Sequence, residues 1–368
     1  MLFKPSPVNV DVDGLVGVVV APDNGELSAL SSGAKPMVSL LGKPLLRHYM
    51  DGLRAIGASR FIVASNVSIS LSDAEVIDYG GDYWATLVKV SEIVSRGSTV
   101  VASSMDIYVP REAYETLMNV HLSMGHDVTV LVAAVEDTSG GFRVNTSSDG
   151  KVLSLVRGGG PGYLHLGLTA IEQDALVKLA GGAELGSLRV GVAHWGGWFT
   201  RVNTPWSLLE IVRNTLANLT SSSISTRARI SPRASMEGPV IIDDDAVLDH
   251  NCTIRGPVYV GRGVYVGTGA LIRNHAAIEE GAIIGANAEV TESLIEPRVT
   301  IGRGAFIGAS LIGHGVVVEP GVVTLTTTMG RKIGAIVGEG ARVGANSVLK
   351  PGSLVKRGEH VAPLTHYG

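Results

Sequence analysis

The sequence is short of three things: cysteine, long apolar runs and an excess of either charge. Its 368 residues include one cysteine, Cys252, so the chain is not a disulfide framework and fits a reducing compartment. A formal net charge of −4 argues against nucleic acid as the main partner. No run approaches the ~20 apolar residues of a membrane helix, and Asp11 and Asp13 interrupt any signal-peptide pattern. We therefore expect a soluble cytoplasmic protein with neither nucleic-acid nor membrane partners.

What the sequence does have is a ladder of apolar residues six positions apart. It runs without a slip from Ile230 to Val290, resumes after a five-residue step at Ile295, and ends at Val355. A helix repeats every 3.6 residues and a strand every 2, so a period of six suits short strands separated by identical turns. Three such hexads close one triangular coil, and stacked coils bury a column that no single repeat buries alone. The pattern resembles the hexapeptide-repeat left-handed parallel β-helix.

Small residues accompany the ladder. The residue four places after each ladder position is small or aliphatic, and Cys252 falls on such a position, which favours a core filler over a reactive thiol. Glycine directly follows many ladder residues, where a positive φ or a close backbone approach favours it: Gly261, Gly267, Gly285, Gly302, Gly308, Gly313, Gly338 and Gly344. The flat faces of such a helix usually need covering, so we expect a homo- or hetero-oligomer, a trimer or larger.

Upstream of the ladder, strand and helix signals alternate. Residues 14–22 read as a buried strand, Pro44 opens an amphipathic helix over 44–56, and 60–65 read as the next strand, which indicates a βαβ unit. Further helices are expected over 84–95, 111–124 and 204–218, strands over 98–104, 128–135, 142–145 and 152–156, a hairpin turn at Asp149-Gly150, and a loop over Arg157–Tyr163. We predict an α/β Rossmann-like domain over 1–219, a linker over 220–227 and the β-helix over 228–368.

A family resemblance is carried by Lys35–Leu46 (KPMVSLLGKPLL), with its Gly42-Lys43-Pro44, in front of the hexad ladder. An α/β domain with this segment, joined to a hexapeptide-repeat β-helix, resembles the sugar-1-phosphate nucleotidylyltransferases. Within them it is most similar to archaeal proteins that couple sugar nucleotidylyl transfer to amino-sugar acetylation, and Gly330–Pro351 also resembles a stretch of those proteins. The resemblance implies a nucleotidyltransferase domain in which a sugar phosphate attacks a nucleoside triphosphate held by Mg²⁺, backbone amides and cations.

The family's triphosphate loop, Gly-x-Gly-Thr-Arg, is altered here. Counted without a gap, its glycines fall on Ala21 and Asp23 with Pro22 between them, and its arginine falls on Gly25. Proline removes a backbone donor, the carboxylate of Asp23 repels phosphate, and Gly25 carries no charge. Lys35 is retained and is the catalytic candidate in this segment. A solvated surface lysine is the alternative interpretation.

The family's metal and sugar positions are only partly kept. Asp106 stands at the first metal position, so it is the predicted catalytic residue and Mg²⁺ ligand, although a plain turn carboxylate is at least as plausible. The second metal position is Arg201, which cannot bind Mg²⁺ and is expected to pair with Asp106. Asn203, which precedes the Thr-Pro helix start, is a predicted substrate-binding residue.

Two further substrate-binding candidates are His165 and Gly167, at the family's asparagine-glycine position. His165 has the chemistry to donate a hydrogen bond to a sugar, and a satisfied structural histidine is the alternative. The family's sugar-phosphate lysine is missing, because its Glu-Lys-Pro aligns with residues 157–159 (RGG).

The acetyl-transfer base of the relatives is also replaced. Arg303 occupies the position of the general base, and a permanently charged guanidinium cannot take a proton. His250, His275 and His314 lie elsewhere on the coils, where turn or interface roles are favoured over a replacement base.

Three hypotheses follow. The first is a regulatory or scaffolding subunit that has lost the chemistry, binds a nucleotide or nucleotide sugar weakly if at all, and assembles with copies of itself or an active paralogue. The second is an active nucleotidylyltransferase with a rebuilt triphosphate site that uses Mg²⁺. The third and weakest is a β-helix acyltransferase that uses acetyl-CoA.

Overall fold

The computed structural model describes residues 14–31, 33–147, 152–326 and 332–368. The chain groups into two compact units, Met1–Asp23 with Leu46–Phe199, and Asn24–Leu45 with Thr200–Gly368. The second unit therefore takes a segment from near the start of the chain. The boundaries 1–219, 220–227 and 228–368 stay a prediction, and the predicted turn Asp149-Gly150 lies outside the described residues.

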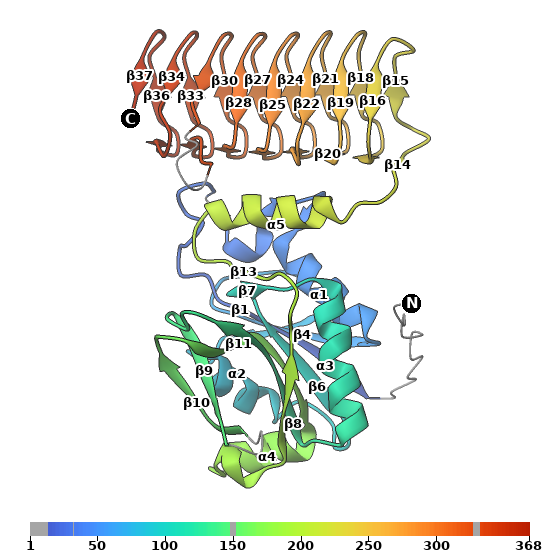
Figure 1. The fold of residues 1–368 in the computed structure, drawn as a ribbon, viewed down its shortest axis with the longest axis vertical. Coiled ribbons are helices and arrows are strands. Elements are labelled where there is room, and N and C mark those ends of the chain that lie inside the picture. The colour runs from blue at the N-terminus through green and yellow to red at the C-terminus, as the bar shows by residue number, and fades with distance from the viewer. Residues whose placement is uncertain (1–13, 32, 148–151, 327–331) are drawn as a thin grey trace. The chain divides into compact units, whose positions relative to one another are not determined.

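The first unit is built on a nine-stranded mixed sheet (Figure 1). Its strands run in the order β10-β9-β11-β6-β1-β4-β5, with β8 paired to β11 and β12 paired to β8. Central β1 is parallel to β4 and β6, whereas β11 is antiparallel to β6. The strands are β1 Leu15–Ala21, β4 Arg60–Ser65, β5 Glu75–Asp78, β6 Thr99–Ser104, β8 Val128–Val135, β9 Gly141–Thr146, β10 Val152–Gly158, β11 Gly162–Glu172 and β12 Val190–His194. The sheet confirms the Rossmann-like prediction.

Helices cover both faces of this sheet. They are α1 Leu45–Ala55, α2 Tyr83–Val90, α3 Arg111–Met124, α4 Gln173–Ala180 and the short η2 Leu185–Ser187. Val16 and Val18 of β1 pack in one core with side chains of α2 and α4. On the other face Gly17 lies against Leu53 of α1, where an added Cβ would come within 3.1 Å of Leu53 Cδ1. Burial on both faces explains why β1 is a continuous apolar run.

Most of the expected elements are confirmed, with two corrections. The helix expected over 84–95 ends at Val90. The loop expected over Arg157–Tyr163 is wrong for most of its length, because β10 continues to Gly158 and β11 begins at Gly162. The pairing of Gly158 with Gly141 extends the β9–β10 hairpin into these glycines.

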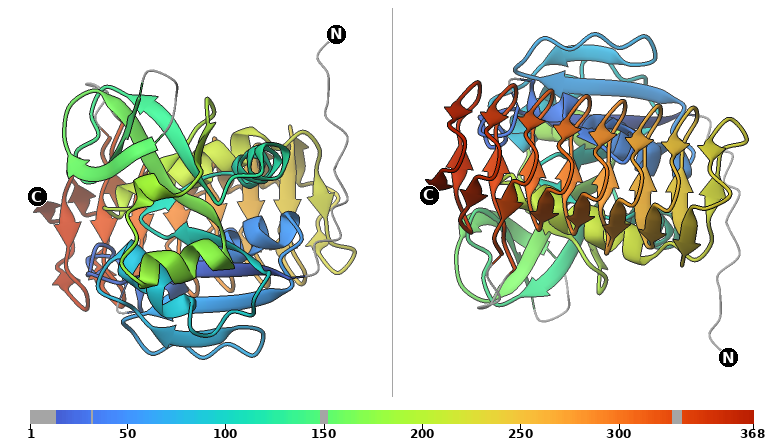
Figure 2. Two further views of the ribbon diagram at one scale, coloured as in Figure 1. Left: turned by 90° about the horizontal axis from the view of Figure 1, so that it is seen from below. Right: turned by 90° about the horizontal axis from the view of Figure 1, so that it is seen from above.

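The second unit contains a left-handed parallel β-helix whose coils stack into three sheets of eight strands each (Figures 1 and 2). The first sheet comprises β14 Ser223–Ile224, β17 Val240–Ile242, β20 Val258–Val260, β23 Ala277–Ile278, β26 Leu294–Ile295, β29 Leu311–Ile312, β32 Ile336–Val337 and β35 Leu354–Val355. The second comprises β15 Arg229–Ile230, β18 Val247–Leu248, β21 Tyr265–Val266, β24 Ile283–Ile284, β27 Thr300–Ile301, β30 Val317–Val318, β33 Arg342–Val343 and β36 His360–Val361. The third comprises β16 Ser235–Glu237, β19 Thr253–Arg255, β22 Leu271–Arg273, β25 Glu289–Thr291, β28 Phe306–Gly308, β31 Val323–Thr324, β34 Val348–Leu349 and β37 His366–Tyr367.

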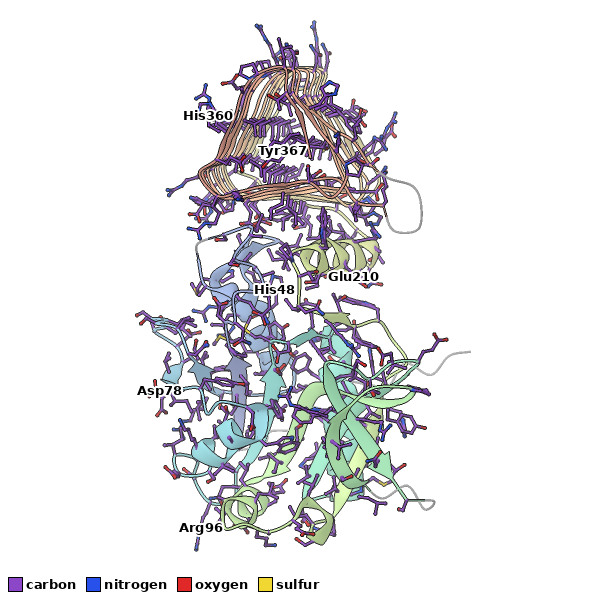
Figure 3. All side chains as sticks on the ribbon, turned by 90° about the vertical axis from the view of Figure 1, so that its left-hand side faces the viewer. His48, Asp78, Arg96, Glu210, His360 and Tyr367 are labelled. Atoms are coloured by element: carbon purple, nitrogen blue, oxygen red, sulfur yellow. The ribbon has the colours of Figure 1, made fainter. Side chains whose placement is uncertain are left out.

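The ladder fills the interior of this β-helix. Ile284, for example, pairs in register with Val266 on the coil before it and Ile301 on the coil after it. Seen end-on, the coils are triangular and apolar side chains point inward (Figure 3). Cys252 belongs to the same buried column, and burial raises the pKa of its thiol to about 11. The core-filler interpretation of this cysteine is confirmed.

Two more pieces of the second unit pack on the β-helix. Helix α5 Trp206–Ala217 lies along the coils (Figure 1) and is tied to them by Arg213, whose guanidinium lies 3.4 Å from the Glu292 carboxylate. The segment Asn24–Leu45 holds η1 Lys35–Met37 and the two-stranded hairpin of β2 Ser39–Leu40 and β3 Lys43–Pro44. Two further short strands are β7 Ile107–Tyr108, which belongs to the first unit, and β13 Thr200–Arg201, which belongs to the second. No helix within the described ranges is long and apolar enough to cross a membrane.

Candidate functional site

The candidate site of the first unit is the edge of the sheet where β1 and β6 end. These strands are parallel, so the residues that follow them converge at one edge, which is where open α/β sheets bind ligands. Val20 pairs in register with Ser104, and the backbone amide of Met105 donates to Val20 O at 2.9 Å. The altered loop at Ala21–Asp23 and the metal candidate Asp106 therefore start from neighbouring positions.

A side chain occupies the altered loop. The Asp23 amide donates to Asn66 Oδ1 at 2.8 Å, and Asn66 Nδ2 donates back to Asp23 O at 2.9 Å. The backbone donor that a phosphate-binding loop would present is thus already paired. Sequence reasoning missed Asn66, whose only signal was an amide residue directly after the expected strand 60–65.

Gly167 and Asp106 both contact Ser104, the last residue of β6. The backbone of Gly167 has φ +71°, and an added Cβ would lie 3.0 Å from Ser104 Cβ. Ser104 Oγ in turn lies 3.3 Å from both Asp106 Oδ2, to which it donates, and the Asp106 amide, from which it accepts. Gly167 is therefore required by backbone conformation and close packing. Its predicted role in substrate binding stays a prediction.

His165 is buried inside the first unit, with a relative exposure of 3%. Its Nε2 lies 3.0 Å from Thr169 Oγ1, and its ring stacks on the indole of Trp84. Burial lowers the pKa of the imidazole to about 4, so the ring is neutral at pH 7. These contacts fit the structural alternative that the sequence left open, and hydrogen bonding to a sugar stays a prediction.

The other three predicted positions belong to the second unit. Lys35 is fully buried and its Nζ lies 3.5 Å from Glu26 Oε1, so the solvated-surface interpretation is wrong. Asn203 is exposed and lies three positions before the first residue of α5. Arg201 ends β13. Because Asp106 lies in the first unit, its pairing with Arg201 stays a prediction, as do the catalytic role of Lys35 and the substrate role of Asn203.

Sequence reasoning also missed a buried carboxylate, Glu279, that holds the segment carrying the family motif. Glu279 Oε1 accepts from the Leu41 amide at 2.7 Å, and Oε2 accepts from Ser39 Oγ at 2.8 Å and the Gly42 amide at 3.0 Å. Gly42 has φ +81°, and a Cβ there would collide with the Tyr259 hydroxyl. Burial raises the pKa of Glu279 to about 7. The start of Gly42-Lys43-Pro44 is thus anchored to a β-helix coil.

The donor set does not fit a protein-held Mg²⁺. Within the described part of the chain, no group of three or more His, Cys, Asp or Glu side chains is placed to hold a metal ion. Asp106 is one carboxylate, and the family's second ligand position is the cation Arg201. Mg²⁺ as a cofactor therefore stays a conditional prediction, and no step is assigned to a metal.

His250, His275 and His314 lie in turns or bends between the strands, whereas His360 and His366 begin β36 and β37. His250 is exposed, and its Nδ1 lies 2.7 Å from Asp249 Oδ1. His275 is half-buried, which lowers the pKa of its imidazole. Arg303 is exposed in the turn between β27 and β28.

These features define a class: proteins in which a Rossmann-like α/β unit is joined to a hexapeptide-repeat β-helix. The model of the GMPPB C-terminal domain family matches residues 236–332, within the coils. Three curated relatives are each named bifunctional protein GlmU. That of Exiguobacterium sibiricum is 28% identical over 132 residues, covering 33% of this chain and 29% of the relative. That of Thermoanaerobacter pseudethanolicus is 23% identical over 154 residues, covering 39% and 34%.

The third relative, from an Exiguobacterium species, is 31% identical over 134 residues, covering 33% of this chain and 29% of the relative. The chain thus spans 29–34% of the length of the curated relatives it matches. Among solved structures, HddC from Yersinia pseudotuberculosis is 17% identical with a TM-score of 0.40, covering 53% of this chain and 96% of that one. These partial matches make the chain similar to the GMPPB C-terminal domain family within the coils, and to the proteins named GlmU over about a third of its length.

Proposed function

We propose that this chain is a non-catalytic regulatory or scaffolding subunit of nucleotide-sugar metabolism, which works in the cytoplasm and assembles through its β-helix. One observation carries the proposal: Asp23 and Asn66 exchange two hydrogen bonds where the family binds a triphosphate. A phosphate would have to displace Asn66 and approach the carboxylate of Asp23. Both requirements oppose binding of the substrate on which nucleotidylyl transfer depends.

The altered charges support the same conclusion. Phosphoryl-type transfer depends on groups that offset developing negative charge, and each such group contributes roughly 3–4 kcal/mol to transition-state stabilisation. Gly25 stands where the family has an arginine, and Arg303 stands where its acetyl-transfer base would be. Charged or basic groups are thus missing from both the triphosphate loop and the acetyl-transfer position. The β-helix coils are therefore the part of the chain that best keeps the family's pattern.

The first prediction is that the isolated chain releases no pyrophosphate. Ordinary enzymes turn over at about 1 s⁻¹ or faster, and we expect this chain to be at least about a thousandfold slower than that lower limit. The reaction mixture contains Mg²⁺, one of a panel of nucleoside triphosphates and one of several hexose 1-phosphates. The measurement is a coupled pyrophosphate assay on the protein alone and beside any homologue that co-purifies with it. Mg²⁺-dependent turnover by the chain alone at ordinary rates would sink the proposal in favour of an active enzyme with a rebuilt site.

A parallel assay addresses the acyltransferase alternative. Acetyl-CoA and an amino-sugar phosphate are supplied, and thiol release is followed. We expect none above the blank. Acetyl-CoA consumption that disappears in His250→Ala would instead show that the base has moved to that histidine.

The assembly surface that we propose is the outward row of the second sheet. This row consists of Val247, Tyr265, Ile283, Thr300 and Val317. Tyr265 is 39% exposed and Ile283 45% exposed, whereas Leu294 and Leu311 on the first sheet are fully buried within the chain. A flat apolar stripe on a parallel sheet is suited to bury against another copy or an active paralogue, in a trimer or larger.

The second prediction is that Ile283→Asp disrupts the oligomer. A carboxylate in the middle of the buried stripe would lose its hydration without a partner, so we expect a lower mass by size-exclusion chromatography with light scattering. Leu354→Asp is the matched control, because Leu354 is 43% exposed but lies on the first sheet. A wild-type monomer, or equal mass in all three proteins, would rule out this interface.

A further inference from the structure

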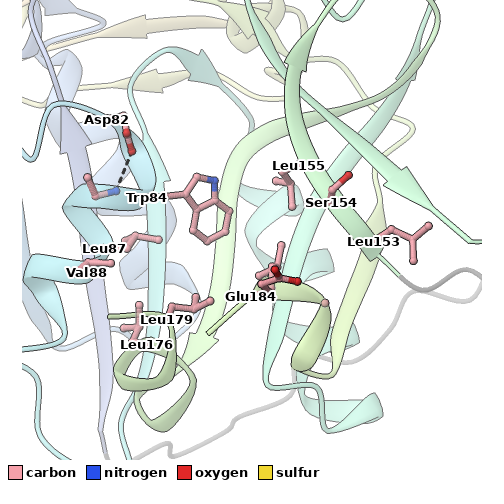
Figure 4. A pocket seen from close by; sticks show the side chains of 13 residues that line it. Asp82, Trp84, Leu87, Val88, Leu153, Ser154, Leu155, Leu176, Leu179 and Glu184 are labelled. Carbon is pink, nitrogen blue, oxygen red and sulfur yellow. Dashed lines mark hydrogen bonds between the residues drawn. The ribbon is translucent and has the colours of Figure 1, made fainter. Parts of the chain in front are cut away.

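A pocket of about 510 Å³ lies in the first unit, apart from the edge of the sheet where β1 and β6 end. It is lined by residues of helices α2 and α4, strand β10 and the short helix η2, and it is open to solvent (Figure 4). Its volume is within the range of small-molecule sites, which are usually concave, largely apolar and few in number. None of the predicted catalytic or substrate-binding residues lines it.

The walls of the pocket are apolar and one of them is aromatic. Leucines line it from four elements: Leu87 on α2, Leu153 and Leu155 on β10, Leu176 and Leu179 on α4, and Leu185 on η2. The indole of Trp84 reaches from α2 toward Leu155 (Figure 4). The imidazole of His165 stacks on this indole with 25° between the planes, and Tyr83 meets it edge-on. The contacts with His165 and Tyr83 therefore fix the orientation of the Trp84 indole.

The charged groups of the pocket are all of one sign. Asp82 and Glu184 line it, and no lysine or arginine does. Asp82 Oδ1 accepts from the Ala85 amide at 2.8 Å, so this carboxylate is fixed at the start of α2. The two carboxylates lie on opposite sides of the pocket with the indole between them (Figure 4), and each attracts cations and repels phosphates and carboxylates. The site is therefore unsuited to nucleotides and sugar phosphates.

The indole also retains a polar atom for a ligand. Among the described residues, none accepts a hydrogen bond from Trp84 Nε1, and Ser154 Oγ accepts one from Asn145 Nδ2 at 3.1 Å. An indole N–H in a partly apolar site usually finds an acceptor, so a hydroxyl, carbonyl or water on the bound molecule would complete it.

We propose that this pocket is a binding site for a small aromatic ammonium compound, whose ring lies among the leucines against Trp84 and whose cationic group faces Glu184. The site stands on the geometry of the first unit alone. It does not depend on whether the chain transfers nucleotidyl groups. A molecule bound in the pocket would contact Trp84, whose ring stacks on His165 of β11. His165 is two residues from Gly167 on the same strand, which borders the candidate site.

The test compares three probes of the same ring with different charges: tryptamine, indole and indole-3-acetate. Binding to the full-length protein is measured by isothermal titration calorimetry and by ligand-observed NMR. We expect tryptamine to bind about fivefold to tenfold more tightly than indole, as a partly exposed ion pair with Glu184 allows. Indole-3-acetate is expected to bind more weakly than indole. No binding of any probe at millimolar concentration, or equal affinity for the three, would overturn the proposal.

Variants locate the binding. Glu184→Gln is expected to reduce the preference for tryptamine, and Glu112→Gln, an exposed carboxylate on α3, is the control that leaves it unchanged. Leu179→Trp fills the pocket and is expected to abolish binding of all three probes. Because that variant carries a folding risk, Leu153→Arg provides an independent test: Leu153 is 59% exposed, so folding tolerates the change.

The expected result of Leu153→Arg is a reversed ranking, with indole-3-acetate bound more tightly than tryptamine. An unchanged ranking in a folded Leu153→Arg protein would place the binding elsewhere and refute the site. Loss of tryptamine binding as self-association rises with protein concentration would show that the pocket is a protein interface, which also refutes it.

Discussion

Replacing Ile284 with alanine is expected to lower the free energy of unfolding by about 2–5 kcal/mol, one of the largest effects of any single change in this chain. Ile284 is fully buried in the column of ladder residues, between Val266 and Ile301. The truncation removes buried methyl groups and leaves a cavity, and rigid coils on either side prevent the site from collapsing. Guanidinium unfolding followed by far-UV circular dichroism measures the loss.

The neighbouring residue supplies the matched control. Ile283 is the same residue type in the same strand, but its side chain points outward and is 45% exposed. Ile283→Ala is expected to change the unfolding free energy of the unassociated chain by less than about 0.5 kcal/mol. Similar losses for the two alanine variants would contradict the assignment of inward and outward positions.

The second large effect is an inverted pH dependence of stability. Burial raises the pKa of Glu279 to about 7 from an ordinary value of 4.5, with Asp243 as a smaller contributor of the same sign. Between these values the unfolded chain has lost the proton while the folded chain keeps it, so stability falls as pH rises. Glu279 alone is expected to make the protein about 3 kcal/mol more stable at pH 4.5 than at pH 8.

Glu296 acts in the same direction. It is 3% exposed, its Oε1 has no hydrogen-bond partner, and burial together with the charge of Glu279 raises its pKa. Denaturant unfolding at several pH values, with Glu279→Gln and Glu296→Gln singly and together, measures each contribution. Glu280→Gln is the control, because that carboxylate is exposed. A double variant with the full wild-type pH dependence would refute this origin.

The β-helix was predictable in detail because its signal is local and repeated. Each ladder residue needs only the coils on either side, and those coils carry the same pattern, so register follows from the period. The glycines after ladder residues were also explained in part. At Gly285 an added Cβ would lie 2.6 Å from the Arg303 amide nitrogen. Close approach is thus the reason there, and positive φ occurs two residues later, as at Gly263 and Gly304.

The anchoring of Asn24–Leu45 could not be predicted, because nothing local encodes it. Its partners lie more than two hundred positions away, and hexad periodicity reports only on neighbouring coils. One signal was present: Glu279 and Glu296 stand directly after ladder residues, at positions where other coils have glycine. A carboxylate there departs from the pattern and must be compensated by some other segment.

The candidate site was predictable as a location and less so as chemistry. Parallel strands bring Ala21 and Ser104 to one edge by rule, so the position of Asp106 followed from the sequence. The pairing of Asn66 with the backbone of Asp23 could not be predicted, because only the folded loop reveals which backbone groups this side chain contacts. The burial of Lys35 was likewise invisible, since a lysine beside a proline is typical of a surface.

The hydrogen bond between Leu41 and Glu279 also imposes an order on biosynthesis. The two residues are 238 positions apart, so at about 5–20 residues per second the ribosome delivers Glu279 roughly ten seconds to a minute after Leu41. During that interval the polypeptide between β1 and α1 has no coil to bind. A nascent chain halted before Glu279 would therefore lack the acceptor for the amides of Leu41 and Gly42. The segment around these residues can take its final conformation only after the coil that carries Glu279 has been synthesised.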